Sequence, residues 1–359
     1  MTTANTRIID ADGHVVEDLE AIMELMPDRY TQKSRIRDPF PPLDHLHSSN
    51  LHIVPPGSFQ EVGPEGWLKF LDDVGIESTV LYPTRGLAFG KVVSREWAVD
   101  LAQAYNNWMY ETYIQKSPRF RVMALIPLQD PEAAATELRR AVEGLGMCGA
   151  VLPFTGSQAN LGRQLYWPIY AEADRLRCCL AIHGGAHANI GLDDLNPYAS
   201  VHALGHPFGQ MISFAAVILN GLCDKFPNIR FGFLEGGVTW LLMCLERFNR
   251  SYETHIQYDP CGEFLQLEAG EQVSEYITRH IQHNRIFISC EGRETNLPYA
   301  IRTVGNSPFV FSTDFPHEVN NEYCKEGIWA LLEDSELSPK DKEAVLHSNA
   351  ERYYNLAQS

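Results

Sequence analysis

The sequence predicts an α/β fold of the (β/α)8 TIM-type barrel, with loop insertions at the face where the strands end. Eight short runs rich in Val, Ile and Phe recur along the 359 residues, and most are followed by a helical pattern. Each run is almost continuously apolar, which is typical of parallel strands buried on both faces. A doubly wound sheet is the alternative, but it leaves two or more of these strands unassigned.

The eight expected strands lie, in chain order, at residues 7–12, 78–82, 120–126, 148–153, 178–183, 229–235, 285–290 and 308–314. The segment 131–145 illustrates the helices between them, because its apolar residues recur with a helical period. Asp130 is a suitable capping residue for this helix, and Pro131 suits its first turn.

Three stretches do not fit the strand–helix repeat, namely residues 31–63, 184–206 and 251–272. A barrel of this type needs about 250 residues. We therefore predict one domain over residues 1–359, with the extra length in these insertions. Insertions at the strand ends are candidates for the walls of an active site or a lid over it.

The composition excludes several classes of protein. The chain has 29 Lys and Arg against 46 Asp and Glu, and its formal net charge of −17 disfavours nucleic acid as a partner. No apolar run approaches the ~20 residues that cross a bilayer, so we expect no membrane partner. The start of the chain lacks the apolar core of a signal peptide, and the eight cysteines form no C-x-x-C pair. Reduced thiols in a cytoplasmic protein are the expectation.

Imidazoles and carboxylates stand on or just after four of the expected strands. Asp12 ends the first strand and His14 follows it, His183 ends the fifth, Glu235 ends the sixth and Asp314 ends the eighth. The active site of such barrels lies where the strands end, so these side chains should converge. A convergent set of His and carboxylate groups is what Zn²⁺, Mn²⁺ or Fe²⁺ binds. A lone Asp at a strand end is more often a cap or turn residue, but coincidence at four strands is much less probable.

Two further groups extend this candidate site. The loop after the fifth strand is rich in imidazole, with His187, His202 and His206. Arg85 follows the second strand, where it is either an ordinary ion pair or a clamp for the carboxylate of a substrate. Both interpretations of Arg85 stay open at this point.

The chain resembles the amidohydrolase superfamily, and more closely the amidohydrolase-related branch that includes aminocarboxymuconate-semialdehyde decarboxylase. The resemblance covers nearly the whole chain and depends on Asp12-Gly13-His14, His183 in AIHGG, Glu235 in FGFLEGGVTW and Asp314 in FSTDFPHE. It implies a divalent metal ion held by Asp12, His14, His183 and Asp314. It also implies that Asp314 acts as base toward a metal-bound water.

Two departures from the family pattern bear on function. Glu235 occupies the sixth-strand position where the hydrolases and decarboxylases usually carry a catalytic His. The end of the fourth strand, residues 151–154, lacks the Lys that bridges two ions in many dinuclear hydrolases. Glu235 with His187 and His206 would instead supply ligands for a second ion. The metal count is therefore one or two.

The leading hypothesis is a metal-dependent hydrolase or lyase. A metal-activated water would attack a small carbonyl- or carboxylate-bearing molecule, or assist C–C lysis, with Asp314 as base. Glu235 or His206 would serve as acid, and Arg85 would anchor the substrate.

The alternative uses the same fold for oxidation. A dinuclear non-haem iron or Fe/Mn centre, held by the four ligands above with Glu235, His187 and His206, would activate O₂ in a monooxygenase. A third hypothesis is a barrel without catalytic activity that serves as a partner for an active homologue. The sequence also allows a homo-oligomer, because barrels often pair through their outer helices.

Overall fold

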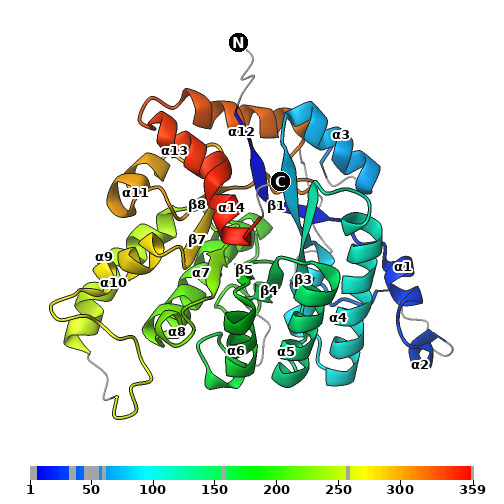
Figure 1. Cartoon of the computed structure of the whole chain (residues 1–359), viewed down its shortest axis with the longest axis horizontal. Helices are drawn as coiled ribbons and strands as arrows, with labels where there is room; N and C mark the ends of the chain where they lie inside the picture. Colours follow the sequence, from blue (N-terminus) through cyan, green and yellow to red (C-terminus); the bar gives the residue numbers. More distant parts are fainter. Residues whose placement is uncertain are drawn as a thin grey trace.

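The computed structural model describes residues 6–31, 38–43, 56–58, 62–154, 159–255 and 259–356. Its centre is one eight-stranded sheet in the order β1-β2-β3-β4-β5-β6-β7-β8, in which every paired neighbour is parallel. Helices surround the strands, as Figure 1 shows. The strands are β1 (Ile9–Val15), β2 (Ser78–Pro83), β3 (Phe120–Leu125), β4 (Gly149–Pro153), β5 (Cys179–His183), β6 (Arg230–Phe233), β7 (Ile286–Cys290) and β8 (Phe309–Phe311).

Backbone hydrogen bonds between the first strand and the segment after the last one close the barrel. The amide of Asp314 donates to the carbonyl of Asp12 at 3.0 Å, and the amide of His14 donates to the carbonyl of Phe315 at 2.7 Å. The predicted (β/α)8 barrel is therefore confirmed. β1 runs three residues further than expected, whereas β6 and β8 end before Glu235 and Asp314.

The α-helices lie outside the strands. They are α1 (Leu19–Glu24), α2 (Asp28–Thr31), α3 (Pro64–Val74), α4 (Arg95–Met109), α5 (Pro131–Arg139), α6 (Trp167–Leu176), α7 (Tyr198–Leu219), α8 (Leu222–Lys225), α9 (Thr239–Thr254), α10 (Val273–Gln282), α11 (Leu297–Val304), α12 (Asn321–Glu333), α13 (Pro339–Glu343) and α14 (Asn349–Tyr354). Asp130 caps α5, since its side chain accepts a hydrogen bond from the amide of Ala133.

Two tyrosines of α14 fill the end of the barrel where the strands begin, which we call the amino-terminal face. Tyr353 and Tyr354 are buried, and α14 lies across the barrel beside β1 and β8 (Figure 1). The hydroxyl of Tyr354 donates to the carbonyl of Ala11 at 2.5 Å and lies 2.7 Å from the hydroxyl of Tyr82. The interior of the barrel is thus packed at this end, and we call the opposite end, where the strands finish, the mouth.

The predicted insertions differ in where they lie. Residues 184–206 form a loop at the mouth that continues into the first turns of α7. Residues 259–272 lie instead at the amino-terminal face, because α9 has carried the chain away from the mouth before this segment begins. There the amide of Gln266 donates to Asp224 of α8, which leads into β6. Most of the 31–63 stretch lies outside the described residues.

Several other expectations concern the molecule as a whole. No described helix combines the length and the apolar character that a bilayer crossing requires. All eight cysteines are free thiols, and Cys261 is exposed. The single domain over residues 1–359, the cytoplasmic location and the homo-oligomer stay predictions.

Candidate active site

Three of the predicted metal ligands meet in a fully buried cluster at the mouth of the barrel. The side chains of Asp12, His14 and His183 are at most 1% exposed. The Nε2 atoms of His14 and His183 lie 3.5 and 3.2 Å from carboxylate oxygens of Asp12. Asp12 and His14 share one face of β1 although a bulge lies between Asp10 and Gly13.

Asp314 supplies a fourth carboxylate to this cluster. It lies just beyond β8 with a φ of 58°, a left-handed backbone that few residues other than glycine adopt. Its Oδ1 atom lies 3.4 Å from Nε2 of His14. Non-glycine residues in this conformation concentrate at functional sites, where neighbouring contacts stabilise them. Here the backbone bond from the Asp314 amide to Asp12 contributes to that stabilisation.

The donor atoms of the cluster fit a divalent metal ion. Ligand atoms about 2.1 Å from one ion lie roughly 3 to 3.5 Å apart, and these donors lie 3.2–3.5 Å apart. Asp12 Oδ2 and His14 Nε2 are buried and have no hydrogen-bond partner among the described residues, so both retain capacity to bind an ion. Nδ1 of His14 lies 2.8 Å from the carbonyl of Pro83, and Nδ1 of His183 lies 3.0 Å from that of Gly184. Such contacts orient each ring so that Nε2 faces the centre of the cluster.

His317 is a site residue that sequence reasoning missed. Its Nδ1 atom lies 2.7 Å from Asp314 Oδ1, and its Nε2 atom lies 2.9 Å from the hydroxyl of Thr84. Its ring stacks on that of His14 with centroids 4.1 Å apart. The feature of the sequence that could have indicated His317 is its position three residues after Asp314. His317 thus connects Asp314 to the end of β2.

Asp10 has a different role from Asp12, although both belong to β1. Its carboxylate accepts hydrogen bonds from the hydroxyl of Thr79 at 2.7 Å and from the amide of Thr313 at 2.8 Å. Thr79 belongs to β2, and Thr313 follows β8. Asp10 therefore joins three neighbouring segments of the barrel, and it belongs to neither of the two groups that could hold an ion in the part of the chain that the structure describes.

Glu235, His206 and His187 form a second cluster beside the first. Glu235 follows β6 with a φ of 56°, and its Oε2 atom lies 3.3 Å from His206 Nε2 and 3.5 Å from His183 Nδ1. The rings of His187 and His206 meet at a right angle, with centroids 4.7 Å apart. A Cβ at Gly184 would lie 2.0 Å from the His206 ring, so only glycine leaves room for this imidazole.

Burial and neighbouring charges set the protonation of the two carboxyl groups that face the mouth. Burial alone would raise the pKa of Glu235, but His206 and His183 lower it well below its usual range. Burial raises the pKa of Asp314 to about 8, although His317 opposes this shift. Glu235 is thus held as a carboxylate beside imidazoles, whereas the burial of Asp314 disfavours its charge as long as no cation lies beside it.

Among the described residues, two groups of three could hold an ion. One is Asp12, His14 and His183, and the other is His14, Asp314 and His317. Glu235, His187 and His206 belong to neither group, so a second ion held by these three residues stays a prediction.

A pocket of about 390 Å³ opens onto these clusters. Asp314, Glu235 and His206 are 15%, 16% and 11% exposed at their side chains, so they border it more openly than the buried ligands do. The other polar side chains in its wall are those of His202, Glu291, Glu318 and Tyr323. Its described lining contains no Lys or Arg. The charged and titratable groups that a molecule meets in this described lining are therefore carboxylates and imidazoles.

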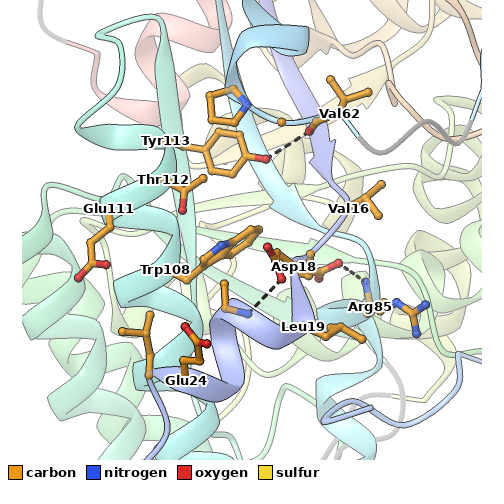
Figure 2. A pocket seen from close by; sticks show the side chains of 15 residues that line it. Val16, Asp18, Leu19, Glu24, Val62, Arg85, Trp108, Glu111, Thr112 and Tyr113 are labelled. Atoms are coloured by element: carbon orange, nitrogen blue, oxygen red, sulfur yellow. Dashed lines mark hydrogen bonds between the residues drawn. The ribbon is translucent and has the colours of Figure 1, made fainter. Parts of the chain in front are cut away.

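Arg85 lies in a different pocket. Figure 2 shows it among the residues that line a hollow of about 830 Å³ beside α1, together with Trp108 and Glu111. Its guanidinium pairs with Asp38 at 2.5 Å, and its amide donates to Glu17. The structure does not bring Arg85 into the ligand cluster. Its role as a substrate anchor stays a prediction.

The sequence is similar to that of a known protein family and to several characterised proteins. The sequence pattern of the amidohydrolase family matches residues 9–356. The chain is 27% identical over 312 residues to the gamma-resorcylate decarboxylase of Rhodococcus jostii, covering 80% of this chain and 86% of that protein. It is 23% identical over 322 residues to the 2-amino-3-carboxymuconate-6-semialdehyde decarboxylase of Dictyostelium discoideum, covering 88% and 84%.

Solved structures show the same fold. The dihydroxybenzoic acid decarboxylase of Polaromonas sp. JS666, with bound manganese and the inhibitor 2-nitroresorcinol, matches with a TM-score of 0.68 and 20% identity, covering 99% of this chain and 98% of that one. The 5-carboxyvanillate decarboxylase of Sphingomonas paucimobilis matches with a TM-score of 0.73 and 20% identity, covering 98% and 99%.

These findings decide between the expected classes of protein. The relatives agree with a hydrolase or lyase of the amidohydrolase type, and manganese in a solved relative agrees with a divalent transition metal. The dinuclear iron oxygenase finds no support among them. Since the family pattern spans nearly all of the sequence, the chain belongs to the amidohydrolase family.

Proposed function

We propose that this protein is a metal-dependent decarboxylase that removes the carboxylate from a small hydroxylated aromatic acid. The observation that carries the proposal is the buried group of Asp12, His14 and His183, with Asp314 beside His14 and in the wall of a pocket of about 390 Å³. The named relatives support C–C lysis, because their substrates are carboxylic acids and several bear ring hydroxyls.

The four ligands would hold one divalent transition metal ion. When bound, such an ion supplies a positive charge that orients oxygen ligands and stabilises negative charge developing on the substrate. The chain supplies the arrangement around it, since Pro83 and Gly184 orient the imidazoles of His14 and His183. Burial of these ligands keeps competing water away from them.

Decarboxylation breaks the bond between the ring and the carboxyl carbon and leaves an electron pair on the ring carbon. That carbon then takes one proton, so the enzyme needs a proton donor at the pocket. Asp314 is assigned to the metal ion, so the donor is a different side chain that borders the pocket. We assign this role to His206, whose Nε2 atom lies beside the carboxylate of Glu235 in the pocket wall.

The pair of Glu235 and His206 stands where relatives of this family usually carry a sixth-strand His. His206 Nε2 lies 3.3 Å from Glu235 Oε2, and both side chains border the pocket. In the proposal, Glu235 orients the imidazole, and His206 holds and transfers a proton. The imidazole thus comes from α7 instead of from the sixth strand.

The walls of the pocket define how the substrate lies. A substrate carboxylate would be repelled by Glu291 and Glu318 in the outer wall, so it faces the ligand cluster. Ring hydroxyls then face outward, where the two glutamates accept hydrogen bonds from them.

The test is a screen of hydroxybenzoic acids with metal-loaded protein, scored by release of CO₂ and formation of the matching phenol. We expect turnover that disappears on chelation and returns on adding Mn²⁺ or Zn²⁺. Matched methyl esters of the same acids distinguish hydrolysis from decarboxylation, because they yield methanol only by hydrolysis. Full metal content and unchanged turnover in Asp314→Asn would contradict the proposal.

A further inference from the structure

A second hollow lies at the amino-terminal face of the barrel, opposite the ligand cluster. It has a volume of about 250 Å³. Its wall combines the starts of neighbouring strands, the end of α6 and the described end of the chain. The lining residues are Arg121, Val142, Gly146, Met147, Cys148, Leu176, Arg177, Cys178, Arg230, Tyr354, Asn355 and Leu356.

Three arginines meet in this hollow from distant parts of the sequence. Arg121 is the second residue of β3, Arg177 is the residue that ends α6, and Arg230 is the first residue of β6. The sheet order places β3, β4, β5 and β6 side by side, and α6 leads into β5. Arg121 and Arg230 are partly buried, whereas Arg177 is exposed.

No carboxylate of the described chain neutralises these guanidiniums. The described lining contains no Asp or Glu, and no ion pair is found for any of the three arginines within the described residues. Arg230 donates from Nε to the carbonyl of Tyr353 at 2.6 Å, which leaves its other donors available. Glu172, an acidic residue in the middle of α6, already pairs with Arg139 and Arg175.

The remaining polar atoms of the hollow do not supply negative charge. Burial raises the pKa of the Cys148 thiol to about 11 and that of Cys178 to about 12, so both thiols stay neutral at physiological pH. Arg177 has a left-handed backbone with a φ of 51°, where Gly or Asn is the usual residue. A concentration of positive charge in a chain of net charge −17 calls for an anionic partner.

We propose that this hollow binds a phosphate group, either as inorganic phosphate or as a small phosphate ester. Guanidinium groups present planar, paired donors that match phosphate oxygens. Phosphate carries close to two negative charges near neutral pH, so it offsets three guanidiniums better than a single carboxylate does. The site lies on the face of the barrel opposite to the ligand cluster and does not depend on the decarboxylase proposal.

Calorimetric titration of metal-loaded protein with inorganic phosphate at constant ionic strength tests the site. We expect saturable binding, together with a rise in the melting temperature. The double variant Arg121→Gln/Arg177→Asn should weaken binding about tenfold or more, since it removes two charges and makes no change to the Arg230 bond. Asn tolerates the left-handed backbone at position 177. Arg247→Gln, an exposed arginine of α9 outside the hollow, is the matched control and should bind like the parent protein.

Three further experiments test whether the measured phosphate binding arises at this hollow. Glycerol phosphate should compete with inorganic phosphate, whereas acetate at the same concentration should not. Metal-free protein should retain phosphate binding, and loss of binding with the metal would place the anion at the mouth and overturn the proposal. A chain ending at Leu356 should bind phosphate like the full chain. Binding that appears only in this shortened chain, or equal binding by the double variant, would also overturn it.

Discussion

The two ends of the barrel carry opposite charge. At the mouth, the pocket wall contains four carboxylates and two imidazoles, with no Lys or Arg in its described lining. At the amino-terminal face, the hollow contains three arginines with no Asp or Glu in its described lining. The same topology produces both, because parallel strands bring all their first residues to one end and all their last residues to the other.

The comparison shows that burial decides whether a cluster of charged side chains needs a bound ion of opposite charge. The carboxylate of Asp12 at the mouth is fully buried beside imidazoles, so it requires a cation or a proton. The arginines of the opposite face are partly open to water, so they are tolerated without a partner. We therefore expect the cation at the mouth to be essential for activity. We expect an anion at the amino-terminal face only to add stability.

The largest expected effect comes from removing a buried ligand at the mouth. Asp12→Ala should lose the metal ion and lower turnover by roughly a thousandfold or more, since a loss of about 4 kcal/mol of transition-state stabilisation has this effect. Metal analysis and the CO₂ assay measure both quantities. Asp38→Ala, an exposed carboxylate near Arg85, is the control and should keep its metal. Stoichiometric metal in Asp12→Ala would show that the ion binds elsewhere.

The next effect concerns the pair that replaces the usual sixth-strand His. Glu235→Gln and His206→Asn should each lower kcat by roughly a hundredfold or more, because each disrupts one proton-transfer unit. The double variant should be no worse than the poorer single variant, since the residues act together. Metal content should stay unchanged in all three. Multiplicative losses in the double variant would mean that the two side chains act independently.

Much of the fold, and the convergence of the candidate metal ligands, was predictable from sequence. The apolar runs gave all eight strands, since strands buried on both faces leave a continuous apolar signal. The convergence of Asp12, His14, His183 and Asp314 was predictable because each lies on a strand or just after one. His317 was missed because its role depends on the turn after β8, which directs its ring between Asp314 and Thr84.

The position of the insertions was less predictable than the strands. Nothing in the composition of residues 251–272 says at which end of the barrel they lie, since this depends on the length of α9. Arg85 likewise lines a different pocket and pairs with Asp38, a contact that no local motif in the sequence indicates. The arginine hollow escaped notice because its members are single residues about 50 to 110 positions apart, with no local motif.

A smaller effect is expected from Glu172, whose ion pairs with Arg139 and Arg175 contrast with the arginines of the hollow, which are unpaired within the described chain. Hydrogen bonds from Arg139 and Arg175 lower the pKa of Glu172 to about 2, from an unfolded value near 4.5. The unfolded chain therefore binds more protons between these values, so this stabilisation is complete above about pH 4.5 and is lost as the pH falls toward 2. Both guanidiniums are half exposed, so we expect about 1–2 kcal/mol in place of the ~3 that the full shift represents.

Urea unfolding of Glu172→Gln against the parent protein measures this contribution. The variant should be less stable at pH 7, and the difference should shrink steadily below pH 4.5. Glu143→Gln is the matched control, because Glu143 pairs with the same Arg175 but is 52% exposed, and it should change stability by less than about 0.5 kcal/mol. A difference that persists at pH 2.5 would show that packing, and not charge, accounts for the effect.

The smallest expected effect is at the outer wall of the mouth, where Glu291 and Glu318 are assigned to the ring hydroxyls of the substrate. Glu291→Gln keeps an acceptor oxygen but removes the charge, so we expect KM to rise about three- to tenfold with kcat nearly unchanged. Glu322→Gln on α12, which is 79% exposed, is the matched control. Steady-state kinetics with the acid found by the screen, and with its analogue lacking the ring hydroxyls, separate the alternatives. If Glu291→Gln raises KM equally for both compounds, the glutamate acts through the general field of the mouth and not through a hydrogen bond to the hydroxyl.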